Sequence, residues 1–366
     1  MALKILIAAG GTGGHIYPAL AMADAFRARY PDAVIEFVGT ADGLENKIIP
    51  AKGFKVHHLP IGRLNSNVGL GERLKTVLRM PFAFLRSISI LRSYRPDFVL
   101  GVGGHASGPL LLMASLLRYR SAIWEPNAMP GLANRWLSSF VDDCWVVFEE
   151  AKPLLRGSHK HRAGMPVRAE IENLVMPDRA ASAEFRVLVF GGSQGARGIN
   201  NTVLELISEG GEWMKGIHFV HQTGPADFPR ISAGYASLRS PPVEVKEYLH
   251  DMGQRYAAAD LVISRSGTGT LSELAACGKA AILIPLPTAA DDHQRKNAES
   301  LVQKGAAVMI VQKDLNVKSL REAIMSLRAN PDRLKEMGRA IRTFHSPKAA
   351  EVLVGEFVER IQDASR

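Results

Sequence analysis

The chain opens with KILIAAGGTGGH, residues 4–15, and this stretch decides the fold. An apolar run of strand length ends in glycines, and the residues that follow can begin a helix. The second half of the chain repeats the pattern in RVLVFGGSQG, residues 186–195. A strand that leads through a glycine turn into a helix is the opening unit of a doubly wound α/β domain. The repetition therefore predicts two such domains.

Short apolar runs alternate with longer amphipathic segments along the rest of the chain. Continuous apolar strands are typical of parallel sheets that helices cover on both faces. The expected strands lie within residues 5–7, 34–38, 98–100, 122–124, 144–147, 187–190, 218–220, 243–245, 261–263, 281–284 and 308–311. We expect domains at 1–163 and 164–346, a connection near 163–183, and a last helix in 347–366 that packs back on the first domain.

Composition excludes several classes of protein. With 366 residues, of which 46% are hydrophobic, the chain can fill two cores. Its two cysteines, Cys144 and Cys277, lie in apolar stretches, which favours buried thiols in a reducing compartment over a disulfide or metal ligands. The sequence contains no run of about 18 uncharged apolar residues, the length that a membrane-spanning helix needs. The net charge of +9 favours anionic partners.

Glycine-rich turns that lead into predicted helices occur four times. Each turn brings unpaired N–H groups and the positive end of a helix dipole to one point, where an anion can bind. They lie at residues 10–15, 103–108, 191–195 and 266–273. Two such turns in each domain indicate phosphate binding, and diphosphate chemistry is the favoured class.

Two other nucleotide sites are weighed against this interpretation. Residues 101–106 fit the dinucleotide pattern G-x-G-x-x-A, with Glu125 as the ribose acid, but the turns after the first strand of each domain do not fit it. The Walker A pattern is absent from the sequence, as is Asp-x-Asp, the usual carboxylate pair for a metal on a diphosphate. We therefore expect no required cofactor, with Mg²⁺ at most stimulatory, and helix N-termini and arginine holding a leaving diphosphate.

Six motifs together carry a resemblance to a known family. They are GGTGGH at 10–15, GGHASGP at 103–109, EPN at 125–127, GGSQGA at 191–196, SRSG-x-x-T-x-x-E at 264–273 and HQ-x-x-NA at 293–298. In order and spacing they closely resemble the MurG family of glycosyltransferases, which act in peptidoglycan assembly. The resemblance implies the GT-B fold, in which two Rossmann-like doubly wound domains face each other across a cleft.

The same resemblance implies the reaction and its setting. N-acetylglucosamine would move from UDP-GlcNAc to the C4 hydroxyl of the muramoyl sugar in lipid I, with inversion, to give lipid II. The implied partners are UDP-GlcNAc, lipid I, an anionic membrane surface and other proteins of cell-wall synthesis, with no nucleic acid. The implied location is the cytoplasmic face of the cell membrane, as a peripheral protein that serves cell shape and division.

The resemblance also assigns the donor site. Glu273 would accept hydrogen bonds from the ribose hydroxyls, Arg168 and the N–H groups near Thr270 would bind the diphosphate, and Gln294 would read the sugar. The full implied set is Thr12, Gly13, Gly14, Asn127, Arg168, Ser193, Tyr248, Leu249, Met252, Thr268, Gly269, Thr270, Glu273, Gln294 and Asn297. Residues 248–252 would cover the uracil. Structural alternatives stay open for three of these features: a solvated helix acid for Glu273, a surface residue for Arg168, and plain core at a helix start for residues 248–252.

The acceptor site is assigned to the first domain. Its implied residues are Gly11, Thr12, Gly13, Gly14, His15, Gly104 and His105. His15 is the candidate base, because imidazole has a suitable intrinsic pKa and the glycine turn presents it. A helix N-terminus disfavours imidazolium, so donation of a hydrogen bond to the acceptor diphosphate stays open as its alternative role. His105 departs from the family pattern, where tyrosine is common, and a structural role stays open for it.

Residues 63–95 form a basic, amphipathic segment with an excess of six positive charges. Its cations interleave with large apolar residues, which is typical of a helix that lies on an anionic bilayer. The candidate membrane residues are Arg73, Leu74, Lys75, Leu78, Arg79, Phe82, Leu85 and Arg86. An ordinary core helix with a basic solvent face is the structural alternative.

Two further functions stay open at this point. A UDP-GlcNAc 2-epimerase would share the donor motifs but has no use for a basic apolar segment. A binding protein for lipid-linked intermediates that catalyses no reaction would not need Glu273, Gln294 and Asn297 placed for a nucleotide sugar.

Overall fold

The structure is a computed structural model, and it describes residues 2–11, 13–62, 69–174, 184–238 and 242–363. The chain divides into two compact units. Unit 1 comprises Met1–Pro166 and Lys348–Arg366, and unit 2 comprises Val167–Pro347. The boundary after Pro166 falls within the connection expected near residues 163–183.

Unit 1 is built around a seven-stranded, fully parallel sheet in the order β3-β2-β1-β4-β5-β6-β7. The strands are β1 Lys4–Ala9, β2 Val34–Thr40, β3 Lys55–Leu59, β4 Phe98–Gly103, β5 Ser121–Glu125, β6 Asp143–Val146 and β7 Lys160–Arg162. The helices are α1 Gly13–Arg29, α2 Glu45–Ala51, α3 Leu70–Tyr94, α4 Ser107–Leu116, α5 Leu132–Leu137 and α14 Ala349–Asp363, with a 3₁₀ helix at Glu149–Leu154.

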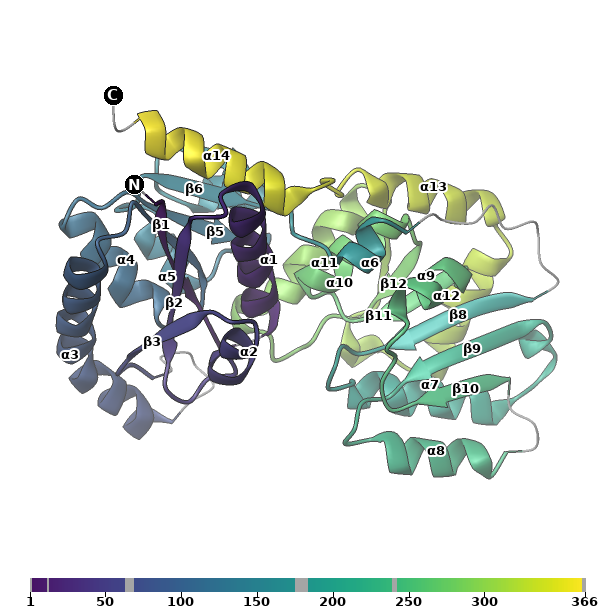
Figure 1. Ribbon diagram of the computed structural model, residues 1–366. Helices are drawn as coiled ribbons and strands as arrows, with labels where there is room; N and C mark the ends of the chain where they lie inside the picture. Colours follow the sequence, from purple (N-terminus) through teal and green to yellow (C-terminus); the bar gives the residue numbers. More distant parts are fainter. Residues whose placement is uncertain (1, 12, 63–68, 175–183, 239–241, 364–366) are drawn as a thin grey trace. The chain divides into compact units, whose positions relative to one another are not determined.

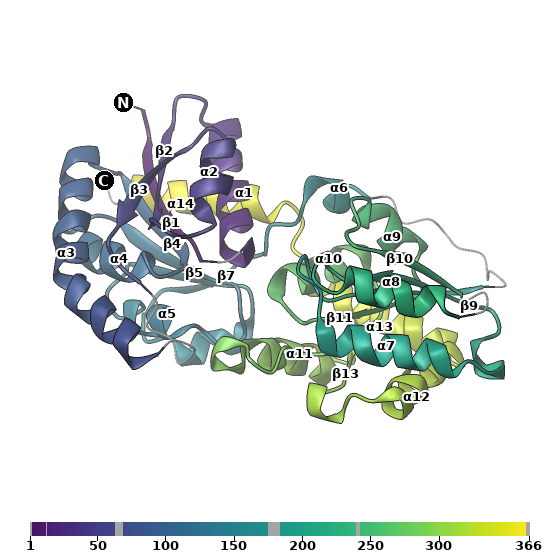
Figure 2. The same cartoon turned by 90° about the horizontal axis from the view of Figure 1, so that it is seen from below.

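Helices cover both faces of this sheet, which explains why its central strands are apolar throughout. On β1, Ile5 and Ile7 point into a core with α1 and α14, while Leu6 points into a second core with α3 and α4. Figures 1 and 2 show these helices on the two sides of the sheet. The last helix, α14, belongs to unit 1, where the buried ring of Phe357 packs against Trp145 with ring centres 4.6 Å apart.

Unit 2 repeats the plan with a six-stranded parallel sheet in the order β10-β9-β8-β11-β12-β13. The strands are β8 Phe185–Phe190, β9 Ile217–Gln222, β10 Val243–Lys246, β11 Leu261–Ser264, β12 Ala281–Leu283 and β13 Val308–Met309. The α-helices are α6 Ala169–Glu172, α7 Arg197–Glu209, α8 Phe228–Ala236, α9 Met252–Ala258, α10 Thr268–Cys277, α11 His293–Gln303, α12 Val317–Arg328 and α13 Pro331–Arg342. Three short 3₁₀ helices lie at Glu212–Met214, Ala290–Asp292 and Gln312–Asp314.

The two doubly wound domains expected from the repeated strand and glycine turn are confirmed. Three details of the strand prediction are wrong. β3 and β7 were not expected, because as edge strands they carry polar residues in place of an apolar run. The strand expected within residues 308–311 ends at Met309, where its pairing with β12 stops.

Candidate functional site

In each sheet, the glycine turns lie where the direction of the strand order reverses. In unit 1 the chain runs from β1 outward to β2 on one side, and from β4 outward to β5 on the other. In unit 2 the same reversal falls between β8 and β11. Ligands of open parallel sheets bind outside the carboxyl ends of the strands at such switch points. The four predicted anion-binding turns therefore form two pairs, one at each switch point.

In unit 1 the backbones of the two turns touch. A Cβ atom on Gly104 would lie 2.7 Å from the carbonyl oxygen of Gly10, and Gly104 has a φ of +94°. A Cβ on Gly103, whose φ is +122°, would lie 2.6 Å from Cδ2 of His15. Only glycine satisfies both the space and the conformation at these two positions. The structure thus brings together Gly11, Gly13, Gly14, His15, Gly104 and His105, while Thr12 lies outside the described residues.

The side chain of Glu45, which was not predicted as a site residue, holds the first of these turns. Its Oε2 accepts a hydrogen bond from the Gly11 N–H at 3.1 Å, and its Oε1 accepts from the N–H and the hydroxyl of Thr40 at 2.9 Å each. Burial is the largest single influence and raises the pKa of this carboxyl, but the hydrogen bonds from backbone N–H groups and from the Thr40 hydroxyl together outweigh it, and the net effect is a lowered pKa. Glu45 therefore anchors the glycine turn to the end of β2 as a buried carboxylate.

Glu125 is a second buried anchor in unit 1. Its carboxylate accepts hydrogen bonds from the N–H and the amide of Asn127, and from the Gly131 N–H and the Asn134 amide, at 2.8–3.1 Å. Burial raises its pKa, and these donors oppose the shift. Because the loop after β5 and Asn134 in α5 together fill four acceptor sites, Glu125 is not placed to read a ribose. This arrangement argues against the dinucleotide site and fixes the predicted residue Asn127 at the end of β5.

At the switch point of unit 2, Glu273 is the central side chain. It lies in the second turn of α10 and is 17% exposed. Its Oε1 accepts a hydrogen bond from Nε of Arg168 at 2.8 Å, and its Oε2 accepts one from the hydroxyl of Tyr256 at 3.0 Å. Burial is the largest single influence and lowers the pKa of Arg168, but the hydrogen bond to Glu273, the Glu273 charge and the nearby Glu170 charge together outweigh it, so the net pKa is raised. The two residues predicted to contact the ribose and the diphosphate thus lie in direct contact.

Gln222, which the sequence did not single out, joins the segment predicted to cover the uracil to the glycine turn at residues 191–195. The buried amide of Gln222 donates to the Gly192 carbonyl at 2.9 Å and accepts from the Leu249 N–H at 3.0 Å. Leu249 and Met252 are buried, whereas the ring of Tyr248 is 44% exposed. Ser193, predicted to bind phosphate, is exposed in the turn that Gln222 holds.

The residues predicted to read the sugar belong to one network around the start of α10. Oε1 of Gln294 accepts from the Leu286 N–H at 3.0 Å, and the backbone carbonyl of Gln294 accepts from the Ser266 hydroxyl at 2.7 Å. The Asn297 amide is fully buried and donates to Ser266 and Thr268 at 3.3 Å. Gly269 and Thr270 are half-buried in the first turn of α10. The sugar contacts of Gln294 and Asn297 stay predictions.

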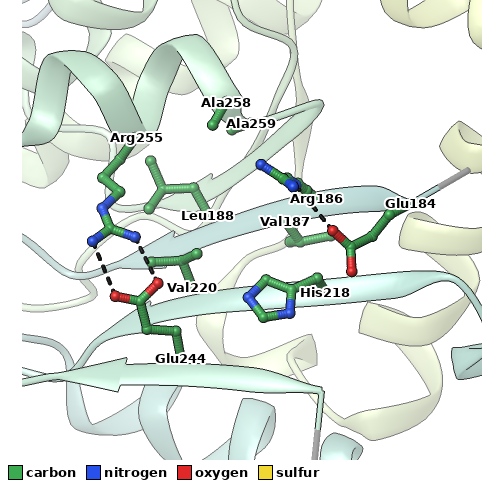
Figure 3. Close-up of a pocket in the computed structure, with 10 residues that line it drawn as sticks. All are labelled: Glu184, Arg186, Val187, Leu188, His218, Val220, Glu244, Arg255, Ala258 and Ala259. Carbon is green, nitrogen blue, oxygen red and sulfur yellow. Dashed lines mark hydrogen bonds and ion pairs between the residues drawn. The ribbon is translucent and has the colours of Figure 1, made fainter. Parts of the chain in front are cut away.

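A pocket of about 290 Å³ lies elsewhere in unit 2 (Figure 3). Its lining includes Glu184, Arg186 and His218 at the amino ends of β8 and β9, the edge of the sheet opposite the glycine turns. In Figure 3 the Arg255 guanidinium pairs with both oxygens of Glu244, at 2.6 and 3.0 Å. None of the predicted site residues lines this pocket, so it is not part of the candidate site.

Neither a metal site nor a membrane span is found in the part of the chain that the structure describes. No three His, Cys, Asp or Glu side chains there are grouped closely enough to hold a metal ion. Among the same residues, every helix is too short or too polar to cross a membrane.

Two doubly wound domains define the GT-B architecture, each with a parallel sheet and paired glycine turns at its switch point. Residues 5–146 match the glycosyltransferase family 28 N-terminal domain, and residues 186–353 match the C-terminal domain of that family. The chain therefore belongs to glycosyltransferase family 28, among the MurG proteins.

Individual relatives agree with this placement. The chain is 47% identical over 358 residues to the "UDP-N-acetylglucosamine--N-acetylmuramyl-(pentapeptide) pyrophosphoryl-undecaprenol N-acetylglucosamine transferase" of Bdellovibrio bacteriovorus, which covers 97% of this chain and 99% of the relative. A crystal structure of MurG from Acinetobacter baumannii matches with a TM-score of 0.82 and 26% identity over 98% of this chain and 99% of that one. A UDP-N-acetylglucosamine 2-epimerase matches with a TM-score of 0.65 at 14% identity, over 100% and 98% of the two chains, a likeness of fold alone.

The lowered pKa of Glu45 leads to a prediction for acid stability. We expect Glu45→Gln to destabilise the protein at pH 7, because an amide cannot accept all three hydrogen bonds. The wild-type protein should therefore have a larger free energy of unfolding than the variant. This difference should be complete above the pKa of an unfolded glutamate, about 4.5, and should shrink as pH falls through the lower native pKa. Urea unfolding of both proteins between pH 7 and pH 3 measures it, with the exposed Glu336→Gln as control. An advantage that stays constant over this range would contradict the anchoring role.

Proposed function

We propose that this chain transfers N-acetylglucosamine from UDP-GlcNAc to the C4 hydroxyl of the muramoyl sugar in lipid I, which gives lipid II. The observation that carries the proposal is the switch point of unit 2. There Glu273, which can accept hydrogen bonds from a ribose, lies next to the amino end of α10, which can hold a diphosphate. The activity in the names of the full-length relatives supports the same reaction.

In the donor site, binding of the diphosphate falls to backbone dipoles and one guanidinium. The N–H groups of Gly269 and Thr270 belong to the first turn of α10, where an α-helix does not pair its own N–H groups. They and Arg168 would stabilise the negative charge that develops on UDP as the bond to the sugar breaks. This charge stabilisation needs no metal, so we expect Mg²⁺ to stimulate the reaction at most.

The acceptor would bind at the switch point of unit 1, where His15 is the proposed base. Its imidazole lies against the backbone of Gly103, at the start of α1. In the reaction the muramoyl C4 oxygen forms a bond to C1 of the donor sugar from the side opposite UDP. The bond from C1 to the diphosphate oxygen breaks, its electron pair leaves with UDP, and the hydroxyl proton passes to His15. The N–H groups of both glycine turns would hold the diphosphate of the acceptor.

The surface of α3 supports contact with a membrane. Its buried side, which includes Ala83, Ile90 and Leu91, packs in the core shared with α4, whereas five large apolar side chains point outward. We call these outward residues, together with the cations among them, the α3 surface: Leu74, Val77, Leu78, Phe82 and Leu85, with Lys75, Arg79 and Arg86. Leu78 is 65% exposed and Phe82 64%. Arg63 and the side chain of Arg73 lie outside what the structure describes.

These exposures favour an interfacial helix over a core helix with a basic solvent face. A lipid-linked acceptor would bring the enzyme to an anionic leaflet, where each cation near the surface contributes about 1 kcal/mol of attraction. We propose that the chain acts as a peripheral protein at the cytoplasmic face of the cell membrane, alongside other proteins of cell-wall synthesis. The exposed α3 surface and the 47% identity to the Bdellovibrio transferase both argue against the 2-epimerase alternative.

A transfer assay tests the proposed function. Purified protein with labelled UDP-GlcNAc and a soluble, short-chain lipid I analogue should form the disaccharide product. Glu273→Ala should raise the donor KM by about 10- to 150-fold, the equivalent of about 1.5–3 kcal/mol for hydrogen bonds to a charged group. Glu299→Ala, which removes a carboxylate from α11 of the same unit, should leave the KM unchanged. Absence of transfer by folded protein would overturn the proposal.

Charge reversal on α3 tests the membrane contact. The triple variant Lys75→Glu, Arg79→Glu and Arg86→Glu should lose sedimentation with anionic vesicles, because each reversal replaces an attraction with a repulsion. It should still turn over the soluble acceptor. A control variant changes the net charge by the same amount at exposed positions of α12 and α13, with Lys318→Glu, Arg333→Glu and Arg339→Glu. This control should still sediment with the vesicles. Equal binding by the two triple variants would show that net charge, and not the α3 surface, governs binding.

A further inference from the structure

Tyr256 is a fully buried residue that the proposed chemistry leaves without a role. It lies in α9, and its ring packs edge-on against Phe190, the last residue of β8, with ring centres 6.1 Å apart. Its hydroxyl donates a hydrogen bond to Oε2 of Glu273 in α10 at 3.0 Å. Burial and the nearby Glu273 charge raise the pKa of Tyr256 well above its ordinary value, so the phenol keeps its proton.

The hydrogen bonds to Glu273 leave a defined number of acceptor sites open. A carboxylate offers about four lone-pair sites, two on each oxygen. Arg168 occupies one site on Oε1, and Tyr256 occupies one on Oε2. Counting hydrogen bonds from the residues that the structure describes, one site then stays open on each oxygen, which matches the two neighbouring hydroxyls of one ribose. The two donors also fix the plane of the carboxylate, since each oxygen is held separately.

Tyr256 also joins two parts of the donor site. It follows Met252 by four residues, so both lie on the same side of α9. Met252 belongs to the segment proposed to cover the uracil, while Glu273 is the proposed ribose contact. The Tyr256 hydroxyl therefore sets the ribose contact at a fixed place relative to the segment that covers the base.

We propose that Tyr256 is a positioning residue that orients both oxygens of Glu273 toward the two ribose hydroxyls, and so makes the enzyme select ribose over deoxyribose donors. This inference rests on the proposed function. Tyr256 touches no reacting atom in this account, and it acts only through Glu273. A merely structural role would lower activity with all donors equally, whereas a positioning role changes the selectivity between them.

The experiment compares kcat/KM for UDP-GlcNAc with that for its 2′-deoxyribose analogue, both on the same preparation. The fraction of folded protein cancels in this ratio, so partial unfolding of a variant does not alter it. Tyr256→Phe removes only the hydroxyl and should lower the ratio about fivefold to tenfold. Glu273→Gln should lower it at least as much. Tyr235→Phe is the matched control, because that buried hydroxyl of unit 2 contacts His221 and not Glu273.

The outcomes separate the two levels of the proposal. If Glu273→Gln and Tyr256→Phe both lose selectivity while Tyr235→Phe keeps it, the positioning role is supported. If Glu273→Gln loses selectivity and Tyr256→Phe keeps the wild-type ratio, the positioning role is overturned and the proposed function stands. If Glu273→Gln keeps the wild-type ratio, the ribose contact itself is wrong. If Tyr256→Phe and Tyr235→Phe lose selectivity equally, the effect comes from general packing, and the positioning role of Tyr256 is also overturned.

Discussion

Direct contact between backbones at the carboxyl ends of the central strands is the constraint on which the rest of the molecule depends. In unit 1 the turn after β4 lies against the turn after β1, where Gly104 meets the Gly10 carbonyl. In unit 2 the turn after β8 lies against the end of β9, where a side chain on Gly195 would overlap the Thr223 carbonyl. Positive φ angles at Gly104 and Gly195 exclude most other residues there. These contacts fix the glycine turns that precede the helices at one edge of each sheet, the edge where we propose that anions bind.

Three glutamates near these edges show how environment assigns different roles to one side chain. Glu45 and Glu125 are buried, and donors from neighbouring residues of unit 1 bind their oxygens: backbone N–H groups and the Thr40 hydroxyl for Glu45, backbone N–H groups and two side-chain amides for Glu125. Glu273 is partly exposed and keeps acceptor sites open. The first two hold the backbone of unit 1 in place, so their value is structural. Only Glu273 combines an open acceptor site on each oxygen with exposure to solvent, which a ligand needs to reach it.

The sequence predicted the parts of this molecule that local pattern encodes. Apolar runs followed by glycine turns located the central strands and both switch points, because strands buried on both faces need continuous apolar residues. The edge strands β3 and β7 were missed, because an edge strand can contain polar residues such as His57 and Lys160 and so lacks a continuous apolar run. Gln222 and Tyr256 were missed for another reason. Their roles come from partners 27 and 17 residues away, and no local pattern indicates such contacts.

Hydrogen exchange on binding UDP tests the central claim most directly, because the proposed contacts are backbone N–H groups at one switch point. We predict slower exchange in residues 191–195, 248–256 and 264–273 of unit 2, with no change at residues 103–108 of unit 1. Protection confined to the glycine turns of unit 1, or unchanged exchange at the start of α10, would contradict the assignment of the donor to the switch point between β8 and β11.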